Sequence, residues 1–468
     1  MDHDDLRTWS RHAADWIRDY HATLRTRPVR APLEPGRTAA QLPAQAPEAP
    51  EPVAEIFADF EALVPDAMTH WQHPRFFAYF PANAAPASML AEQLANGLAA
   101  QCMLWQTAPA ATEMEQVVTG WLRDALGLGG RFSGTIHDSA TTATLAAVLT
   151  MRERALDWRG NTRGLAAGPV LRLYASAQTH SSVDKAARVA GLGQDNLVKV
   201  ATDGDHAMCP QALAAAIRED RAAGHVPAGV ILCVGGTGIG AFDRVAESVE
   251  VARREGVPTH VDAAWAGSAM ICLEFRDLWA GVEGADSVVV NPHKWLGAQF
   301  DCAVQFLADP SAQQRTLGLR PDYLHTPGAG EVTDFNEWTL PLGRSFRALK
   351  LWFVLRAYGL EGLRARIRGH VAWAQELCTA LEALPQIEIV TPPALSLFTF
   401  ALRAGDAATA DLLARINDDG RIYLTQTRHD GRFVIRVQVG QFDCTRDDVM
   451  MVRDVVAELT GRSARGGP

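Results

Sequence analysis

Hydrophobic and polar positions change their pattern several times along the first sixty residues. Residues 4–25 place apolar side chains at helical spacing, at Leu6, Trp9, Ala13, Trp16, Ile17 and Tyr20, which predicts an amphipathic helix. Residues 28–53 are rich in Pro and Ala and lack periodicity, so we expect an extended connector before a helix at 53–63. The two tryptophans of the first helix need a surface to cover, either a second subunit or their own domain.

The next stretch reads as helical. Helices are expected at 89–101, 109–126 and 145–156, and the last of these opens at Ser139 with a run of small hydroxyl residues. Thr112 with Glu115 three residues later has the pattern of a capping box, which would make Thr112 an N-cap.

Between residues 169 and 290, short apolar runs alternate with helical patterns. Strands are expected at 170–175, 197–200, 229–234, 259–261 and 287–290, and helices at 182–190, 211–223 and 245–255. This alternation predicts an α/β fold with a mostly parallel sheet covered on both faces. Two helices at 349–358 and 363–384 follow, and then a small α+β part at 386–468 with a hairpin around residues 429–431.

Composition narrows the protein class. The 468 residues allow two or three domains, and the net charge of -10 argues against nucleic acid or an anionic membrane as the main partner. No apolar run approaches the ~18 residues that span a bilayer, and the acidic N-terminus lacks a signal-peptide core. The seven cysteines are scattered, so we expect no metal site and a reducing, cytoplasmic setting. The bias toward Arg and Ala reflects genome composition, and we expect a bacterial protein.

The candidate chemistry gathers at predicted strand ends. Lys294 follows the β-branched run 287–290 and is one of only four lysines, with Lys185, Lys199 and Lys350. Asp262 and His180 also follow predicted strands, and the helix start at 139–142 offers free N–H groups and hydroxyls to a phosphate. Pyridoxal 5′-phosphate needs such parts: an amine for its aldehyde, a carboxylate for its ring nitrogen and donors for its phosphate. Taken singly, a salt-bridged lysine and an ordinary N-cap would explain them as well.

Seven segments together resemble the group II pyridoxal-phosphate decarboxylases, and are most similar to the aromatic-L-amino-acid decarboxylases that act on tryptophan, tyrosine or DOPA. The segments are 73–81 (HPRFFAYFP), 109–115 (PAATEME), 139–145 (SATTATL), 180–182 (HSS), 260–268 (HVDAAWAGS), 291–296 (NPHKWL) and 341–347 (PLGRSFR). The likeness runs from the N-terminal segment to about residue 360 and is weaker beyond.

The resemblance implies a fold and an assembly. It implies the fold type I, aspartate aminotransferase-like architecture of pyridoxal-phosphate enzymes. Residues 1–84 would form an N-terminal helical segment that wraps the dimer partner, 85–360 the large cofactor-binding domain and 361–468 the small α+β domain. The protein would be a homodimer with its active site at the subunit interface, and would bind neither nucleic acid nor membrane.

The resemblance also implies roles at the cofactor. Lys294 would bind the cofactor's aldehyde, Asp262 would pair with the pyridinium nitrogen, and His180 would stack on the ring. Tyr323 matches the mobile-loop tyrosine that protonates the substrate's Cα after CO2 leaves. The remaining cofactor contacts would come from Ala140, Thr141, Thr237, Ala264, Asn291 and His293.

The expected substrate is an aromatic L-amino acid. Its binding residues would be Trp71, Tyr79, Phe80, Pro81, Ala82, Met103 and Gly343. An apolar, aromatic wall favours aromatic side chains over glutamate, which would need a fixed cationic partner. Gly343 matches a position where indole-accepting plant relatives carry Gly, while Ala82, Gln101, Met103 and Asp138 depart from the animal pattern.

The expected reaction releases CO2 and an arylalkylamine. A competing hypothesis is an aldehyde synthase on the same scaffold, although that switch replaces the loop tyrosine or the stacking histidine in relatives, and Tyr323 and His180 are both present. Two further hypotheses are a decarboxylase of a non-aromatic amino acid, such as an acidic one, and an inactive homologue that serves as a binding scaffold. The inactive homologue would be expected to lack Lys294, Asp262 or Tyr323.

Overall fold

The chain forms two compact units. The computed structural model describes residues 1–31, 34–166, 168–319 and 332–463. The first unit comprises Met1–Pro81, Trp373–Val390 and Thr399–Pro468, and the second comprises Ala82–Ala372 and Thr391–Phe398. The three-part division at 84/85 and 360/361 stays a prediction.

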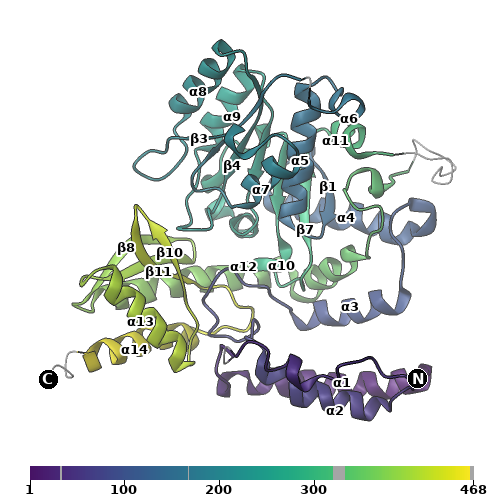
Figure 1. Cartoon of the computed structure of the whole chain (residues 1–468), viewed down its shortest axis with the longest axis vertical. Helices are drawn as coiled ribbons and strands as arrows, with labels where there is room; N and C mark the ends of the chain where they lie inside the picture. Colours follow the sequence, from purple (N-terminus) through teal and green to yellow (C-terminus); the bar gives the residue numbers. More distant parts are fainter. Residues whose placement is uncertain (32–33, 167, 320–331, 464–468) are drawn as a thin grey trace. The chain divides into compact units, whose positions relative to one another are not determined.

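The second unit carries a large sheet, which within the described residues has seven strands in the order β1-β7-β6-β5-β4-β2-β3 (Figure 1). The strands are β1 (Ser133–His137), β2 (Leu171–Ser176), β3 (Leu197–Val200), β4 (Val226–Cys233), β5 (Thr259–Asp262), β6 (Ser287–Val290) and β7 (Ala303–Leu307). The helices of this unit are α3 (Pro86–Leu98), α4 (Pro109–Leu126), α5 (Ala140–Ala155), α6 (Gly160–Arg163), α7 (Ser182–Val189), α8 (Pro210–Ala222), α9 (Val245–Arg254), α10 (Pro292–Trp295) and α11 (Pro310–Leu317).

All strands of this sheet except β7 run in one direction. β3, β2, β4, β5 and β6 pair in parallel, and β7 pairs antiparallel with both β6 and β1. β1 therefore points the same way as β6, and the carboxyl ends of β1, β2, β4, β5 and β6 lie at the same edge. In open α/β sheets this edge is where ligands bind.

Helix α5 anchors the sheet. It contacts β1, β4, β5, β6 and β7 and packs beside α7 and α11. Val148 and Met151 of α5 are buried in one apolar cluster with Leu173 of β2, Ile231 of β4 and Val183 of α7. Because the N-terminus of α5 follows β1 after two residues, this packing also fixes the position of the helix start at the ligand edge.

The first unit contains the N-terminal helices and the C-terminal α+β part. Its helices are α1 (His3–Thr23), α2 (Val53–Leu63), α13 (Asp406–Asp419) and α14 (Arg446–Ser463), and α12 (Arg347–Glu382) enters it at Trp373. A smaller sheet has the order β10-β11-β9-β8, with β8 (Ile387–Ala394), β9 (Leu397–Leu402), β10 (Thr425–His429) and β11 (Arg432–Gln438). The tip of the β8–β9 hairpin, 391–398, counts with the second unit.

The predicted amphipathic face of α1 packs against α2. Trp9 lies 5.4 Å from Phe57 between ring centroids, and Trp16 lies 4.9 Å from Phe60. The tryptophans therefore have partners within their own chain. Neither helix contains a fully buried residue, so the pair still leaves apolar surface open.

Most predicted elements of the α/β region are present within one to three residues of the expected ends, and the predicted α/β class is confirmed. Gly359, with φ of 62°, breaks α12 between the two predicted helices. Three strands were not predicted: β1, β7 and β8. No helix among the described residues is long and apolar enough to cross a membrane.

The prediction of a capping box at Thr112 is wrong. The N-cap of α4 is Ala108, which makes no side-chain cap bond, and Pro109 occupies the first helical turn. Thr112 is buried inside the helix, and the carboxylate of Glu115 turns to other partners. Proline fits the first turn because its missing N–H would have no helical acceptor there, so the helix begins four residues earlier than a capping box at Thr112 would place it.

The packing of α5 on β4 yields the first prediction. A Cβ on Gly229 would lie 2.2 Å from Sδ and 3.2 Å from Cβ of Met151, so Gly229→Val should overpack this contact. We expect the free energy of unfolding in urea to fall by about 1–3 kcal/mol. The double variant Gly229→Val with Met151→Ala should recover part of that loss. Equal loss in the single and double variants would contradict the packing account.

Candidate active site

Five strand ends bring the predicted cofactor residues to one edge of the large sheet. Each residue follows the carboxyl end of a strand that points the same way: Ala140 and Thr141 after β1, His180 after β2, Thr237 after β4, Asp262 and Ala264 at β5, and Asn291, His293 and Lys294 after β6. Neighbouring strands lie about 4.8 Å apart, so residues distant in sequence are gathered within the reach of a small molecule.

Lys294 is held on a short helical turn. α10 follows β6 directly, and the Lys294 N–H donates to the Asn291 carbonyl at 2.9 Å. Asn83 clamps this turn from a distant segment, because its Nδ2 donates to the Lys294 carbonyl at 2.7 Å and its backbone N–H to the His293 carbonyl at 3.2 Å. The Asn83 clamp was missed in the sequence, where this stretch reads as an apolar loop. Its only signal in the sequence was a single asparagine among small residues, and the structure buries that side chain fully.

His293 fixes the orientation of the Asn291 amide. Nδ1 of His293 accepts the Cys302 N–H at 2.9 Å, and burial lowers the pKa of His293 to about 3, so the neutral ring carries its proton on Nε2. That Nε2 lies 3.2 Å from the Asn291 amide and needs an oxygen acceptor there. The other end of the buried amide has no hydrogen-bond partner among the described residues, and it is then the NH2 group, a donor.

Asp262 is a buried carboxylate at the end of β5. Its Oδ1 accepts the Ala264 N–H at 3.1 Å, and the Ala264 carbonyl in turn accepts the Asn291 N–H at 2.9 Å. These two bonds tie the ends of β5 and β6 together. They hold the Asp262 carboxylate in place on the strand next to the one that carries Lys294.

His180 lies within electrostatic reach of both Asp262 and Lys294. Burial lowers the pKa of His180, the charge of Asp262 raises it and the charge of Lys294 lowers it further. Nδ1 of His180 accepts the Ser182 N–H at 3.0 Å, which leaves the proton of the neutral ring on Nε2. The ring is therefore a neutral, flat group at neutral pH, suited to covering an aromatic cofactor.

The start of α5 offers donors to an anion. Ser139 is the N-cap, and its Oγ accepts the Thr142 N–H at 3.2 Å. The N–H groups of the next residues, Ala140 and Thr141, precede the first helical bonds and have no acceptor in the helix. The helix dipole adds favourable potential for negative charge at this end.

The loop after β4 packs closely against two other segments of the same chain. A Cβ on Gly235 would lie 2.5 Å from the Cβ of Ala266, and one on Gly236 would lie 2.8 Å from the Gln178 carbonyl oxygen. Glycine is therefore required at both positions, and the loop can carry Thr237 past these neighbours. The role of these glycines is therefore close packing.

These features fit pyridoxal phosphate. A lysine amine, a buried carboxylate and a neutral imidazole share the edge of the sheet, and a helix N-terminus follows β1 at the same edge. The unpartnered amide of Asn291 supplies a further buried donor beside Lys294. The cofactor needs each of these groups, one for its aldehyde, one for its ring nitrogen, one for its ring face and the others for its phosphate.

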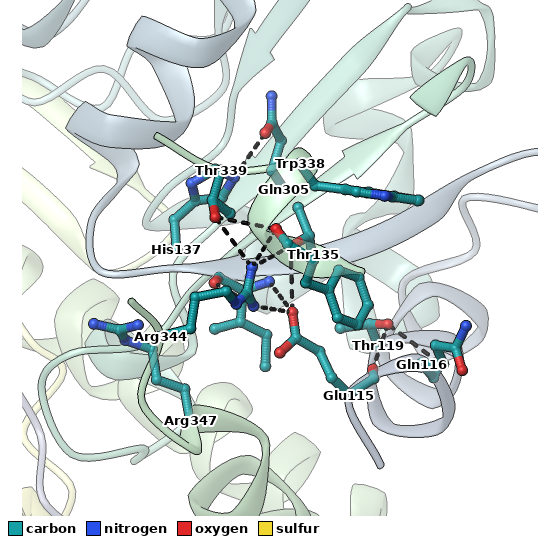
Figure 2. Close-up of polar contacts among 12 residues, drawn as sticks. Glu115, Gln116, Thr119, Thr135, His137, Gln305, Trp338, Thr339, Arg344 and Arg347 are labelled. Atoms are coloured by element: carbon teal, nitrogen blue, oxygen red, sulfur yellow. Dashed lines mark hydrogen bonds and ion pairs between the residues drawn. The ribbon is translucent and has the colours of Figure 1, made fainter. Parts of the chain in front are cut away.

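A buried ion pair binds the backbone at the end of β1, at this edge of the sheet (Figure 2). Arg344, from the segment 341–347, pairs with Glu115 of α4, and both side chains are buried. Glu115 also accepts the Ile136 N–H at 2.8 Å, while Arg344 donates to the carbonyls of Ile136 and Phe335, each at 3.2 Å. The pair thus links α4, the end of β1 and the segment that follows residue 331. Two of the sequence segments that resembled the family meet here.

The same segment positions Gly343. The Arg344 N–H donates to Oε1 of Gln101 at 2.6 Å, and a Cβ on Gly343 would lie 3.1 Å from Nε2 of Gln101. Met103 is bound to the segment that precedes Gly343, because its carbonyl accepts the Asn336 N–H at 3.1 Å. The close contact with Gln101 therefore explains why position 343 is a glycine. A cavity of about 570 Å³ beside them is lined by charged residues as well, among them Glu92, Asp301, Arg347 and Lys350.

The predicted aromatic substrate residues belong to the first unit. Trp71 and Tyr79 are exposed and stack at 5.7 Å with an interplanar angle of 19°. Tyr79 has a φ of 49°, a left-handed conformation that favours glycine, and Arg436 donates to its carbonyl. Phe80 lies under the Arg436 guanidinium at 4.6 Å, and Pro81 is buried. Ala82 begins the second unit, and Tyr323 lies outside the described residues.

Comparisons with known proteins agree with this geometry. The model of the pyridoxal-dependent decarboxylase conserved domain matches residues 35–403. The chain is 37% identical over 459 residues to aromatic-L-amino-acid decarboxylase of Rattus norvegicus, covering 94% of each, and 36% identical over 457 residues to phenylacetaldehyde synthase of Arabidopsis thaliana, covering 94% and 92%. A crystal structure of Oryza sativa TDC with PLP and tryptamine superposes with a TM-score of 0.95 at 34% identity, covering 99% of each chain.

The fold is that of the pyridoxal-phosphate-dependent decarboxylases. The chain belongs to the pyridoxal-dependent decarboxylase family, and its cofactor is pyridoxal 5′-phosphate. The resemblance seen in the sequence is thereby confirmed, as is the predicted cofactor.

The buried histidines of this region predict an acid-sensitive fold. Burial lowers the pKa of His137 to about 3, of His260 to about 4 and of His293 to about 3. Between pH 6.5 and 5 the unfolded chain takes up protons on these rings and the folded chain does not, so stability is complete above pH 6.5 and falls as the pH drops. Each proton contributes a slope of about 1.4 kcal/mol per pH unit at its maximum.

Urea unfolding at pH 7, 6 and 5 checks this expectation. The variant His260→Gln removes one titrating ring and should give a shallower loss of stability over the same range. A free energy of unfolding that stays constant from pH 7 to pH 5 would show that these histidines are not kept neutral, and a slope that His260→Gln leaves unchanged would show the same for His260.

Proposed function

We propose that this protein decarboxylates an aromatic L-amino acid, such as Trp, Tyr, DOPA or Phe, to the arylalkylamine and CO2. The observation that carries the proposal is the buried Asp262 carboxylate at the end of β5, tied by hydrogen bonds to the end of β6, which Lys294 follows, at the strand edge where the cofactor of this family would bind. The names of the curated relatives support the substrate class.

The proposed roles follow from the chemistry of each side chain. When bound, pyridoxal phosphate supplies an electron sink for the bonding electrons left by departing CO2. The amine of Lys294 holds the cofactor's aldehyde carbon. The carboxylate of Asp262 keeps the proton on the ring nitrogen, and its place at the end of β5, tied to the end of β6, supports this role.

The remaining proposed roles concern orientation and proton transfer. The neutral imidazole of His180 covers the ring, and the phosphate is bound by Ala140 and Thr141 N–H groups and by the amide of Asn291. Thr237, Ala264 and His293 complete the contacts from the neighbouring strand ends. Tyr323 delivers the proton to the substrate's Cα, a role that rests on the sequence resemblance. A closed site would exclude water from the reacting carbon.

The aromatic side chain is proposed to bind Trp71, Tyr79, Phe80, Pro81, Ala82, Met103 and Gly343. The exposed, stacked pair of Trp71 and Tyr79 supports an aromatic ligand, since offset aromatic rings attract one another beyond their buried area. The preference for tryptophan drawn from Gly343 is weakened, because Gln101 already accounts for the glycine.

An aldehyde synthase is the second candidate function. The relative named phenylacetaldehyde synthase, 36% identical, favours it. The stacking histidine and the loop tyrosine are both present in this chain, which favours the amine product. Decarboxylation of a non-aromatic amino acid is a third candidate, and the charged lining beside Gly343 is the feature that would suit it.

We further propose a bacterial, cytoplasmic homodimer with the active site at the subunit interface. Apolar side chains that remain exposed support a partner surface: Leu6 and Ile56 on α1 and α2, and Leu90, Leu94 and Leu98 on α3. The N-terminal segment 1–84 would wrap the partner, next to a cofactor domain at 85–360 and a small domain at 361–468.

Lys294 is expected to be the site of covalent attachment. Borohydride reduction of the cofactor-loaded protein, followed by peptide mass spectrometry, should place the reduced cofactor on the peptide that contains Lys294. Lys294→Ala should abolish the adduct and lower turnover by several orders of magnitude, and Lys199→Ala should leave both unchanged. An adduct on another lysine in the wild-type protein would overturn this assignment.

The product decides between the candidate functions. The loaded enzyme should convert Trp, Tyr, DOPA or Phe to the amine without forming peroxide, as read by mass spectrometry and a peroxide probe. Aldehyde with stoichiometric peroxide would establish the synthase instead. Turnover of glutamate but of no aromatic amino acid would contradict the aromatic substrate and leave the cofactor site intact.

A further inference from the structure

A second cavity, of about 480 Å³, lies at the opposite edge of the large sheet from Lys294. Pro227 and Ala228 line it from the start of β4, Thr259 from the start of β5 and Asp286 from the residue before β6. β5 has four residues, so Thr259 and Asp262 stand roughly 10 Å apart along the same strand, at opposite edges. The cavity is thus separate from the site already described.

Three arginines line this cavity, and they differ in their partners. Arg154 lies between two carboxylates, Asp286 and Asp309, each at 3.0 Å. Arg253 pairs with Glu250 at 2.9 Å. Arg131, in the part of the chain that the structure describes, has no carboxylate within ion-pair distance.

Arg131 is exposed, and two contacts orient its guanidinium. Its Nη2 donates to the Ala285 carbonyl at 3.0 Å, and its Cζ lies 5.2 Å from the ring centroid of Phe132, which is fully buried. The remaining N–H groups can serve a ligand, and a guanidinium matches the two oxygens of a carboxylate.

Apart from Thr259 and Asp286, the rest of the wall is glycine or apolar side chains. Its apolar members are Ala155, Pro227, Ala228, Val249, Val257 and Pro258. The one carboxylate in the lining, Asp286, is engaged by Arg154 and by the Thr259 N–H at 2.9 Å, so both of its oxygens have partners within the wall. A bare inorganic anion would leave most of this apolar surface without a partner.

We propose that this cavity binds a small organic carboxylate with an apolar body, anchored by Arg131. The carboxylate pairs with the Arg131 guanidinium, and the apolar body packs on the proline and valine side chains. Arg253, already paired with Glu250, lines the cavity without a free charge. The site is independent of the proposed reaction, because none of its lining residues lies at the strand ends that carry Lys294 and Asp262.

Calorimetric titration of the cofactor-loaded enzyme with phenylacetate tests the proposal. Arg131→Gln should weaken binding at least about tenfold, since a hydrogen-bonded charge pair is lost. The matched control is Arg254→Gln, an exposed arginine at the end of α9 that does not line the cavity, and it should bind as the wild type does. Phenylacetamide, which has the same shape without the charge, should bind more weakly than phenylacetate.

Three results would overturn the proposal. The first is absence of phenylacetate binding to the wild-type enzyme. The second is equal affinity in wild type and Arg131→Gln, which would place the ligand elsewhere, such as at the catalytic edge. The third is inorganic phosphate binding as tightly as phenylacetate with the same dependence on Arg131, which would show a plain anion site. Unchanged thermal unfolding of Arg131→Gln confirms that the variant is folded.

Discussion

The shared direction of β1, β2, β4, β5 and β6 is the constraint on which the site depends. A strand of four to eight residues places its two ends roughly 10–25 Å apart, so reversing one strand would remove its residue from the site. Parallel pairing of β2, β4, β5 and β6 is set by helical crossovers, and the antiparallel β7 leaves β1 pointing the same way. The residues after these strands then meet without being near in sequence.

Buried polar contacts hold that edge in register. Arg344 and Glu115 join α4 to the end of β1 and to the segment after residue 331, while Asn83 holds the turn that carries Lys294. Buried charges are unfavourable unless paired, so such a pair is a strong geometric constraint once formed. His293 and Asn291 constrain each other in a similar way. The proton on Nε2 of His293 determines that the amide oxygen of Asn291 faces His293 and that its NH2 group faces the other side.

Local patterns in the sequence predicted the helices and strands whose formation depends on residues close to one another in the chain. Short β-branched runs predicted β3 and β6 at their observed ends, and the residues placed after strand ends lie at one edge of the sheet. The capping box at Thr112 failed because Glu115 is bound by Arg344, more than two hundred residues away, which no local pattern can indicate. Strands β1 and β7 were missed for a related reason: polar His137 and Gln305 are buried in them, and that burial is compensated by their mutual hydrogen bond at 2.8 Å and by the bonds of Gln305 to Gln313, none of which a local pattern indicates.

The central claim is that Asp262 and Lys294, on neighbouring strands, act on one cofactor. The most direct measurement is the 15N chemical shift of the ring nitrogen in isotopically labelled pyridoxal phosphate bound to the protein. We predict a protonated nitrogen in the wild type and loss of that protonation in Asp262→Asn, because the carboxylate stabilises the charge there and the amide does not. A ring nitrogen that is unprotonated in the wild type, or equally protonated in both proteins, would contradict the account.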